Sequence, residues 1–437
     1  MRLRRPGGLW RHRDFRNLWA AETISVFGSQ IDDLAIGFVA ILVLDASAFE
    51  VAVLGTLNFA PFILLTLPAG VWVDRLRRRP ILIGADFARA GLLATVPIAY
   101  ALDALTLSHL YLVVFLVGAC QVFFDVAYQS YLPSLVDRDE IVEGNSKLEI
   151  SRSSAQVTGP GIGGTLVELV TAPYAVLVDA LSFVASGVFL LRIRKREEAP
   201  RVVSADGRKP SMWSELKEGL RFVAGNPNLR AQAGCTATSN LFSSLAFAIF
   251  LVFAVRELRL SPAVIGLVFS VGAAGSLLAA FTARRISDRF GIGPTSIVMA
   301  AVFGPSMFLV ALAPAGNAAV PFLIAAQLLF GFSVVVYNIA QVSYRQAICP
   351  PRLQGRMNAV MRFIVWGTIP VGTIAGGGLA TWLGLRETIF VGAAGGGLAF
   401  LWLLLSPQRH LRELPAPIDD DEAVEAGVAE ALPSVRA

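Results

Sequence analysis

The sequence predicts an all-α membrane protein with twelve transmembrane helices, arranged as two six-helix pseudo-repeats. Of the 437 residues, 55% are hydrophobic and only 16% are charged, and the mean hydropathy is +0.63. This composition is too apolar for a soluble domain of the same size. About twelve stretches have the roughly 20 apolar residues that cross a hydrocarbon core of ~30 Å. A repeat with a period of half the chain relates the first six stretches to the last six.

The expected spans are continuous apolar runs separated by short polar connections. Each is about twice as long as the ~10-residue alternating strands of an outer-membrane barrel, so the sequence excludes a barrel. In chain order the spans cover residues 18–44, 51–73, 80–102, 107–132, 147–170, 172–192, 231–255, 264–286, 294–313, 320–347, 357–383 and 387–406.

Two pairs of equivalent positions indicate the repeat. Asp74-Arg75 lies between two apolar runs, and Asp288-Arg289 lies at the equivalent place 214 residues later. Arg152 precedes Pro160 by eight residues, and 210 residues further on Arg362 precedes Pro370 by the same interval. A long internal repeat in a polytopic protein indicates a transporter whose halves rock about a shared central site.

The basic residues predict the orientation and the domain limits. Of 37 Lys and Arg, 31 fall on one side of the predicted spans, and only Arg256, Arg259 and Arg386 fall in the opposite loops. The positive-inside rule therefore places both termini in the cytoplasm. The expected parts are a basic N-terminus that stays in the mature protein, a first bundle, a linker with an amphipathic helix, a second bundle and a disordered acidic tail, at residues 1–17, 18–193, 194–230, 231–406 and 407–437.

The connection after the second span carries a glycine, an acid and a cluster of arginines. Gly70 would allow close helix packing, and Asp74 with Arg75, Arg78 and Arg79 would place charges at the membrane edge, where they can pair with acids or lipid phosphates. Basic inner loops are general in polytopic proteins, but they do not explain an acid directly before an arginine at the same place in both halves.

These residues resemble the signature of the major facilitator superfamily, G-x-x-x-D-R-x-G-R-R. Arg77 stands in place of the second glycine, whereas the C-terminal copy keeps it as Gly291 and has Arg284 in place of the first. The resemblance implies the major facilitator fold. It also implies that Gly70, Asp74, Arg75, Arg78, Arg79, Asp288 and Arg289 form a latch between conformations.

A glycine-rich stretch in the fifth span narrows the class of transporter that the sequence resembles. Pro160 removes a backbone donor and Gly159, Gly163 and Gly164 remove side chains, which favours a hinge or close helix packing. The stretch resembles the core of the antiporter motif of facilitator-superfamily exporters. The segments 124–133, 145–149, 178–183 and 355–359 resemble bacterial exporters grouped with the enterobactin exporter and macrolide-efflux proteins.

Ionisable residues inside the spans are the candidates for proton coupling, because a charge at mid-bilayer costs at least ~2.5–3.5 kcal/mol and persists only when paired or facing water. Glu22, Asp32 and Asp33 share one face of the first span, and Asp125 lies in the fourth span and Arg152 in the fifth. Asp33 is the first choice. The alternatives are structural hydrogen bonding for Asp32 and Asp33 and an inert buried pair for Asp125 and Arg152.

Two further groups lie within the spans. Asp86 and Arg89 in the third span are expected to brace the Asp74 turn. Aromatic and amide side chains suit a cavity for a bulky amphipathic compound of drug, macrolide or siderophore type. The candidate cavity residues are Asn58, Phe62, Gln121, Tyr128, Asn240, Gln327, Tyr337, Asn338, Gln341, Arg362 and Trp366.

The functional prediction is a secondary active exporter in the bacterial inner membrane that works by proton antiport with alternating access, and a monomer is expected. Its partners would be a small molecule, protons and membrane lipids. No Walker loop, metal-ligand spacing or nucleic-acid motif is present, so no enzyme activity, cofactor, metal or nucleic acid is expected. Two alternatives stay open: a lysophospholipid flippase of the same fold, and a non-transporting membrane sensor or scaffold.

Overall fold

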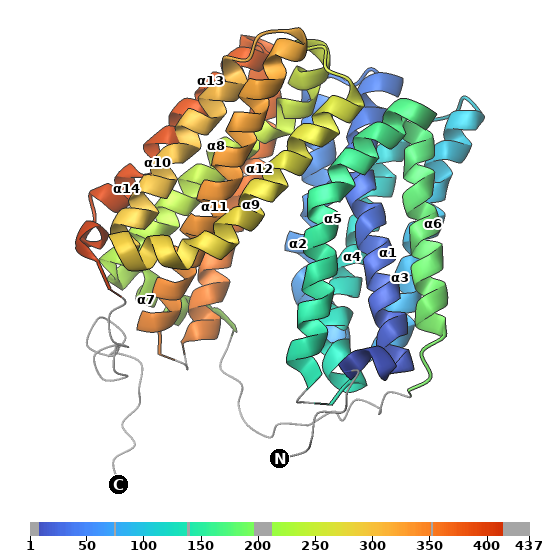
Figure 1. The fold of residues 1–437 in the computed structure, drawn as a ribbon, viewed down its shortest axis with the longest axis horizontal. Helices are drawn as coiled ribbons and strands as arrows, with labels where there is room; N and C mark the ends of the chain where they lie inside the picture. The colour runs from blue at the N-terminus through green and yellow to red at the C-terminus, as the bar shows by residue number, and fades with distance from the viewer. Residues whose placement is uncertain (1–7, 74–75, 138–139, 196–211, 351–352, 414–437) are drawn as a thin grey trace. The chain divides into compact units, whose positions relative to one another are not determined.

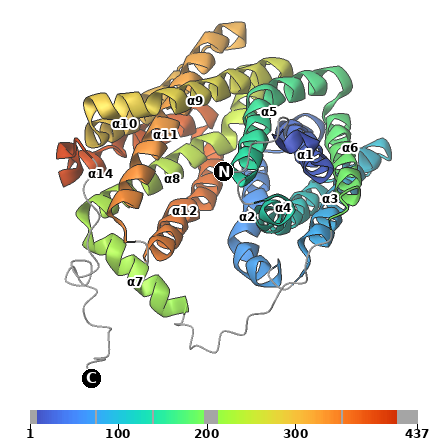
Figure 2. The same cartoon turned by 60° about the horizontal axis from the view of Figure 1, so that its bottom comes forward.

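The computed structural model describes residues 8–73, 76–137, 140–195, 212–350 and 353–413. The elements of this part of the chain are helical, as Figures 1 and 2 show. The long helices are α1 (Arg13–Phe38), α2 (Ala48–Val73), α3 (Arg78–Ala101), α4 (Leu107–Leu135), α5 (Ile141–Val170), α6 (Ala172–Leu191), α8 (Pro227–Arg256), α9 (Pro262–Phe290), α10 (Ile292–Ala311), α11 (Val320–Ile348) and α12 (Gln354–Leu383).

Shorter elements lie between and beside these helices, among them the 3-10 helices η4 (Gly316–Ala319) and η5 (Pro407–His410). The 3-10 helix η1 (Gly8–Arg11) precedes α1, which continues through the π-helical turn η2 (Val39–Val43). Between α6 and α8 lies α7 (Met212–Gly225), and the last span is formed by α13 (Leu385–Leu398) with α14 (Leu401–Leu404).

Eleven helices of the described chain are long and apolar enough to cross a membrane. The remaining predicted span, the fifth at residues 147–170, lies within α5, which has 30 residues but a more polar sequence that includes Glu149 and Arg152. The prediction of an all-α membrane protein is confirmed.

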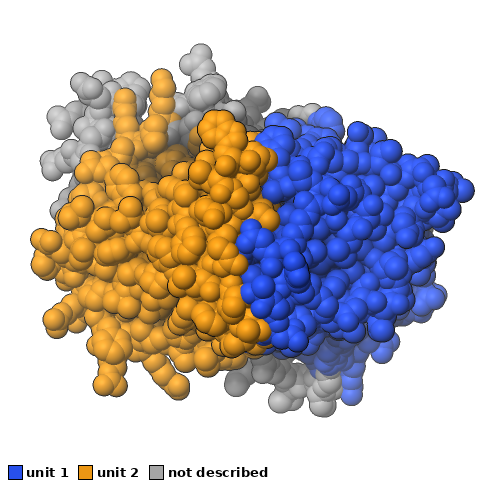
Figure 3. Space-filling view, turned by 90° about the horizontal axis from the view of Figure 1, so that it is seen from above, with its two compact units in different colours: residues 1–204, 251–271, 315–317 blue, residues 205–250, 272–314, 318–437 orange. Residues whose placement is uncertain are grey.

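The chain divides into two compact units, which Figure 3 colours separately. Unit 1 comprises residues 1–204, 251–271 and 315–317, and unit 2 comprises residues 205–250, 272–314 and 318–437. In unit 1, α1 packs between α5 and α6, α3 packs on α4 and α6, and α2 packs on α4. In unit 2, α10 packs on α11 and α13, and α7 packs on α12.

Residues with a positive φ recur at equivalent connections of the two halves, with the period of the sequence repeat. The left-handed residues Asp45 and Arg259 follow the first helix of each half and lie 214 residues apart. Thr171 and Gly384, with φ of 77° and 102°, stand between the fifth and sixth helices of each half. The connections themselves, and not only the apolar runs, are therefore duplicated.

The two copies of the signature turn differ at the position of the second glycine. Gly291, between α9 and α10, has φ of +90°, a conformation that favours glycine. Arg77, at the equivalent place before α3, has φ of −69° and ψ of 131°, which any residue can adopt. The first turn therefore does not need the glycine that its sequence lacks.

Helix α7 packs on unit 2 through its apolar face. Phe222 and Val223 are buried in a cluster that includes Met357 and Val360 of α12. Glu218 forms an ion pair with Arg356 at the beginning of α12. The sequence analysis expects an amphipathic helix in this linker, and in the structure the buried apolar residues of the helix contact α12.

Candidate functional site

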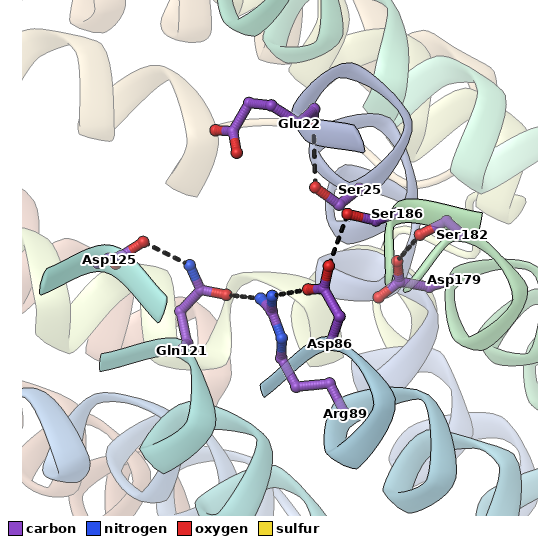
Figure 4. A network of polar contacts seen from close by, with 9 residues as sticks. All are labelled: Glu22, Ser25, Asp86, Arg89, Gln121, Asp125, Asp179, Ser182 and Ser186. Carbon is purple, nitrogen blue, oxygen red and sulfur yellow. Dashed lines mark hydrogen bonds and ion pairs between the residues drawn. The ribbon is translucent and has the colours of Figure 1, made fainter. Parts of the chain in front are cut away.

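Polar side chains from α3, α4 and α6 meet in the interior of unit 1 (Figure 4). Asp86 and Arg89 lie one turn apart on α3 and form an ion pair, with 0% and 2% of their side chains exposed. Asp86 also accepts a hydrogen bond of 2.6 Å from the Ser186 hydroxyl of α6. A buried charge is tolerated only when it is paired and hydrogen-bonded, and both conditions hold here.

Arg89 connects this pair to α4. Its guanidinium donates to Gln121 Oε1, and Gln121 Nε2 donates to Asp125 Oδ1 at 2.7 Å. The guanidinium also lies over the rings of Phe183 and Phe124, with its Cζ 4.0 and 4.5 Å from their centroids. One cation is thus held between carboxylates on α3 and α4, and the amide of Gln121 relays its contact to Asp125.

Glu22 of α1 lies apart from this hydrogen-bonded chain. Its side chain is 7% exposed, and Oε1 is 3.6 Å from Nη2 of Arg152 on α5. The other oxygen, Oε2, is buried and has no hydrogen-bond partner in the described part of the molecule. Glu22 and Asp125 are close enough for their charges to interact. Glu22 is therefore a buried carboxylate with one long ion pair and one unused acceptor.

Asp32 and Asp33, in the last third of α1, lie in a separate group near Asp179 of α6. Asp33 is exposed and accepts a hydrogen bond of 3.3 Å from Gln30 of its own helix. Asp32 has one buried oxygen without a described partner and interacts electrostatically with Asp179 of α6. Asp179 is 1% exposed and accepts a hydrogen bond of 2.8 Å from Ser182.

The predicted latch residues are only partly visible. Asp74 and Arg75 lie outside the described residues. Arg79 donates to the carbonyl oxygens of Leu190 and Leu191 at the end of α6, at 3.1 and 2.8 Å. A methyl group at Gly70 would meet no described atom within 4 Å, so the close packing expected there is not seen.

The second copy of the latch is exposed. Asp288 pairs with Arg284 at 3.6 Å, and both side chains are more than two thirds exposed. The Arg289 guanidinium lies over the ring of its neighbour Phe290, 5.7 Å from the centroid.

The glycines of α5 face two helices. Methyl groups at Gly159 and Gly163 would lie 2.4 Å from Gln30 Cβ and 3.0 Å from Ile31 Cα, both on α1. A methyl group at Gly164 would lie 2.2 Å from the carbonyl oxygen of Pro262, at the beginning of α9. These glycines therefore allow α5 to lie against α1 on one face and α9 on another.

The contact between α5 and α9 is reciprocal. A methyl group at Gly266 would lie 2.2 Å from the carbonyl oxygen of Pro160, and Gly161 N–H donates to Ser270 Oγ at 2.9 Å. Glu168 accepts a hydrogen bond from the backbone of Ala263 at 3.2 Å. The sequence analysis did not find Gly266 or Ser270, although the small residues at four-residue spacing in α9 are a signal for close packing.

The predicted cavity residues of unit 1 lie on α2 and α4. Phe62 stacks on Phe59, with ring centroids 6.1 Å apart, and Asn58 is exposed. Tyr128 stacks on Phe124 at 5.9 Å, and its hydroxyl is buried without a described partner. Gln121 belongs to the Arg89 chain.

The predicted cavity residues of unit 2 divide into core and surface. Gln327, Tyr337 and Gln341 are less than 10% exposed, so in this structure they are core residues. The hydroxyl groups of Tyr337 and Thr236 form a hydrogen bond of 2.8 Å. The side-chain amide of Gln341 donates a hydrogen bond to Asn338 at 2.7 Å, and that of Asn240 donates one to the carbonyl oxygen of Val365 at 3.0 Å. Arg362 and Trp366 are exposed, with the guanidinium 5.1 Å from the ring centroid.

Asp86, Arg89, Asp179 and Ser186 form contacts that the sequence analysis did not assign. It expected Asp86 and Arg89 to brace a turn, whereas both reach into the bundle interior toward α4 and α6. An acid and a base three residues apart inside an apolar span indicate a buried pair, but the sequence does not show which helices such a pair connects.

Solved membrane transporters have the same fold. A bacterial homologue of the iron transporter ferroportin superposes with a TM-score of 0.69 at 19% identity, over 90% of this chain and 98% of that one. The likeness shows that this chain has the major facilitator fold.

The family follows from the sequence comparison. Residues 8–428 match the transmembrane secretion effector family, and the chain belongs to it. The multidrug efflux pump Tap of Mycolicibacterium fortuitum is 27% identical over 356 residues, 79% of this chain and 84% of Tap. Macrolide efflux protein A of Streptococcus pyogenes is 24% identical over 380 residues, 85% of this chain and 91% of that protein. The resemblance to facilitator-superfamily exporters is confirmed.

Proposed function

We propose that this transporter exports bulky amphipathic organic compounds in exchange for protons. The observation that carries the proposal is the Glu22 carboxylate, which is buried, has one long ion pair to Arg152 and has an unused acceptor atom. The oxygen of this buried carboxylate that has no hydrogen-bond partner is an atom at which a proton can be bound and released. The efflux functions named for Tap and macrolide efflux protein A support the direction and the substrate class.

In this scheme the Glu22 carboxylate holds and releases the proton. Arg152 is half-exposed and can turn away from Glu22, whereas Arg89 is fixed between Asp86 and Gln121. Movement of Arg152 would change the charge balance at Glu22 without disturbing the buried pair. The geometry thus favours Glu22 over Asp33, the first choice from the sequence, because Asp33 is exposed and already accepts a hydrogen bond within α1.

The test is transport by the purified full-length chain in proteoliposomes with an imposed pH gradient. Ethidium and a macrolide serve as probes, because one is a cationic dye and the other a bulky amphipathic drug. Glu22→Gln should abolish uphill accumulation of the probes and still allow their downhill exchange. Glu387→Gln makes the same chemical change at an exposed position of α13 and should transport normally.

Other outcomes separate the alternatives. Normal gradient-driven transport by Glu22→Gln would refute the assignment of Glu22 as the proton-coupling residue. Loss of coupling in Asp33→Asn alone would assign that role to Asp33 instead. Movement of a lysophospholipid probe that ignores the pH gradient would indicate a flippase. Absence of flux for every probe in the wild-type chain would indicate a sensor or scaffold.

A further inference from the structure

A separate pocket lies in unit 1 where the chain enters its first span. It has a volume of about 490 Å³ and is bounded by η1, the first turns of α1 and the end of α6. Its wall contains three arginines, two tryptophans and an asparagine, namely Arg13, Arg16, Arg192, Trp10, Trp19 and Asn17. It shares no residue with the polar interior described above.

The pocket has an uncompensated positive charge. Its wall contains no Asp or Glu. Within the described chain, the guanidinium groups of Arg13, Arg16 and Arg192 are exposed and form no hydrogen bond or ion pair. The nearby acid Asp14 is engaged elsewhere, because its oxygens accept the backbone N–H groups of Arg194 and Lys195 at 3.1 and 2.9 Å.

A polar donor in the wall also lacks a partner. The side-chain nitrogen of Asn17 is buried and has no acceptor among the described residues. A buried donor without an acceptor costs about 1–3 kcal/mol, so a ligand with free oxygens would satisfy it. Guanidinium groups and an amide N–H together are the donors that bind phosphate oxygens.

A neighbouring hollow, which shares Arg13 with this pocket, differs from it in the charges of its wall. It is lined by Asp14 and Asp137 as well as Arg13, Arg194 and Lys195, so its acids and bases nearly balance. Of these two hollows, the one beside Trp10 and Trp19 combines several cations with no acid.

The aromatic side chains place the pocket at the level of lipid headgroups. Trp10 is 42% exposed and meets Trp19 edge to face, with ring centroids 4.9 Å apart. Tryptophan is enriched where a span meets the headgroup region, and the span of α1 begins at Arg13. The pocket therefore lies at the depth where a phospholipid has its phosphate group.

An apolar strip continues from the pocket along α6. Its exposed side chains are spaced by three or four residues and share one face of the helix. They are Leu181, Val184, Val188 and Leu191, each between 38% and 59% exposed. A free phosphate would use only the arginines, whereas a phospholipid would use the arginines and this strip.

We propose that the pocket binds the headgroup phosphate of an anionic phospholipid, with an acyl chain lying along the exposed strip of α6. Phosphatidylglycerol is the probe that represents this class.

The test is native mass spectrometry of the full-length protein in detergent with equal amounts of phosphatidylglycerol and phosphatidylcholine. The wild-type chain should retain phosphatidylglycerol preferentially. Arg16→Gln combined with Arg192→Gln should lower this retention by about fivefold for each arginine removed. The doubly substituted Arg16→Lys, Arg192→Lys chain keeps the charge and should keep most of the preference.

The control is Arg259→Gln, which removes one positive charge at the other end of unit 1, beside the Arg256–Asp45 ion pair that follows α1. Its lipid retention should equal that of the wild-type chain, and elution volume and melting temperature should show that every variant is folded. Equal retention in the Arg16, Arg192 glutamine variant and the wild-type chain, or an equal loss in Arg259→Gln, would overturn the proposal. Displacement of phosphatidylglycerol by inorganic phosphate would assign the pocket to a free anion instead.

Discussion

The crossing of α5 and α9 makes a sharp prediction for Gly164→Ala. The added methyl carbon would lie 2.2 Å from the carbonyl oxygen of Pro262 and 3.1 Å from Cα of Gly266. Both are backbone atoms, so no side chain can turn away to make room. Favourable carbon contacts begin near 3.5 Å, and the two helices would have to separate by roughly 1 Å.

The cost of this separation sets the expected magnitude. Inserting a methyl group into a packed contact costs about 1–3 kcal/mol, which corresponds to a five- to 150-fold lower population of the close arrangement. Because alanine favours the helix by about 1 kcal/mol over glycine, the local helix itself should not be weakened. The loss is therefore specific to the contact between α5 and α9.

The assay is disulfide cross-linking between Glu168→Cys and Ala263→Cys in a chain whose three native cysteines are replaced. In the unsubstituted chain the Glu168 carboxylate accepts a hydrogen bond of 3.2 Å from the backbone N–H of Ala263, so a disulfide between these two positions reports the contact between α5 and α9. The initial cross-linking rate should fall at least fivefold in Gly164→Ala. It should not change in Gly84→Ala, where a methyl group on α3 meets nothing within 4 Å. An unchanged rate in Gly164→Ala would refute the reasoning.

Two other substitutions test the buried pair and the second signature turn. Arg89→Met leaves Asp86 as an uncompensated buried carboxylate and should destabilise the fold by about 3–5 kcal/mol, seen as a large fall in melting temperature. The exposed ion pair of Arg284 offers the comparison, and an equal fall in Arg284→Met would contradict the assignment. Gly291→Ala forces a φ of +90° on a residue with a side chain and should cost about 1–2 kcal/mol. Arg77→Ala, at the equivalent turn, should leave the melting temperature unchanged, and equal effects at the two positions would argue against the difference in backbone conformation.

The sequence predicted the helices closely because each span ends where apolar residues give way to charged or turn-forming ones. The predicted spans 107–132 and 357–383 lie within the observed helices Leu107–Leu135 and Gln354–Leu383. The π-helical turn after α1 and the packing of α7 on α12 left no such signal, because they depend on contacts between segments distant in the chain.

The candidate site was less predictable for the same reason. Helical spacing shows that Glu22 and Asp33 share a face of the first span, but not which of them meets a partner. Only the packing of α5 against α1 brings Arg152 to Glu22, and only α6 brings Asp179 near Asp32. The role of Arg89 depends on the rings of Phe124 and Phe183, which lie on two other helices.

The polar character of α5 has a consequence for how the protein is made. Among the long helices of the described chain, α5 is the one whose sequence is not apolar enough to count as a membrane span by itself. An arginine near the middle of an inserting helix costs about 2.5–3.5 kcal/mol at the translocon, and in the finished protein Glu22 of α1 offsets part of that cost for Arg152. We therefore expect the fifth helix to insert less completely in a chain that lacks α1.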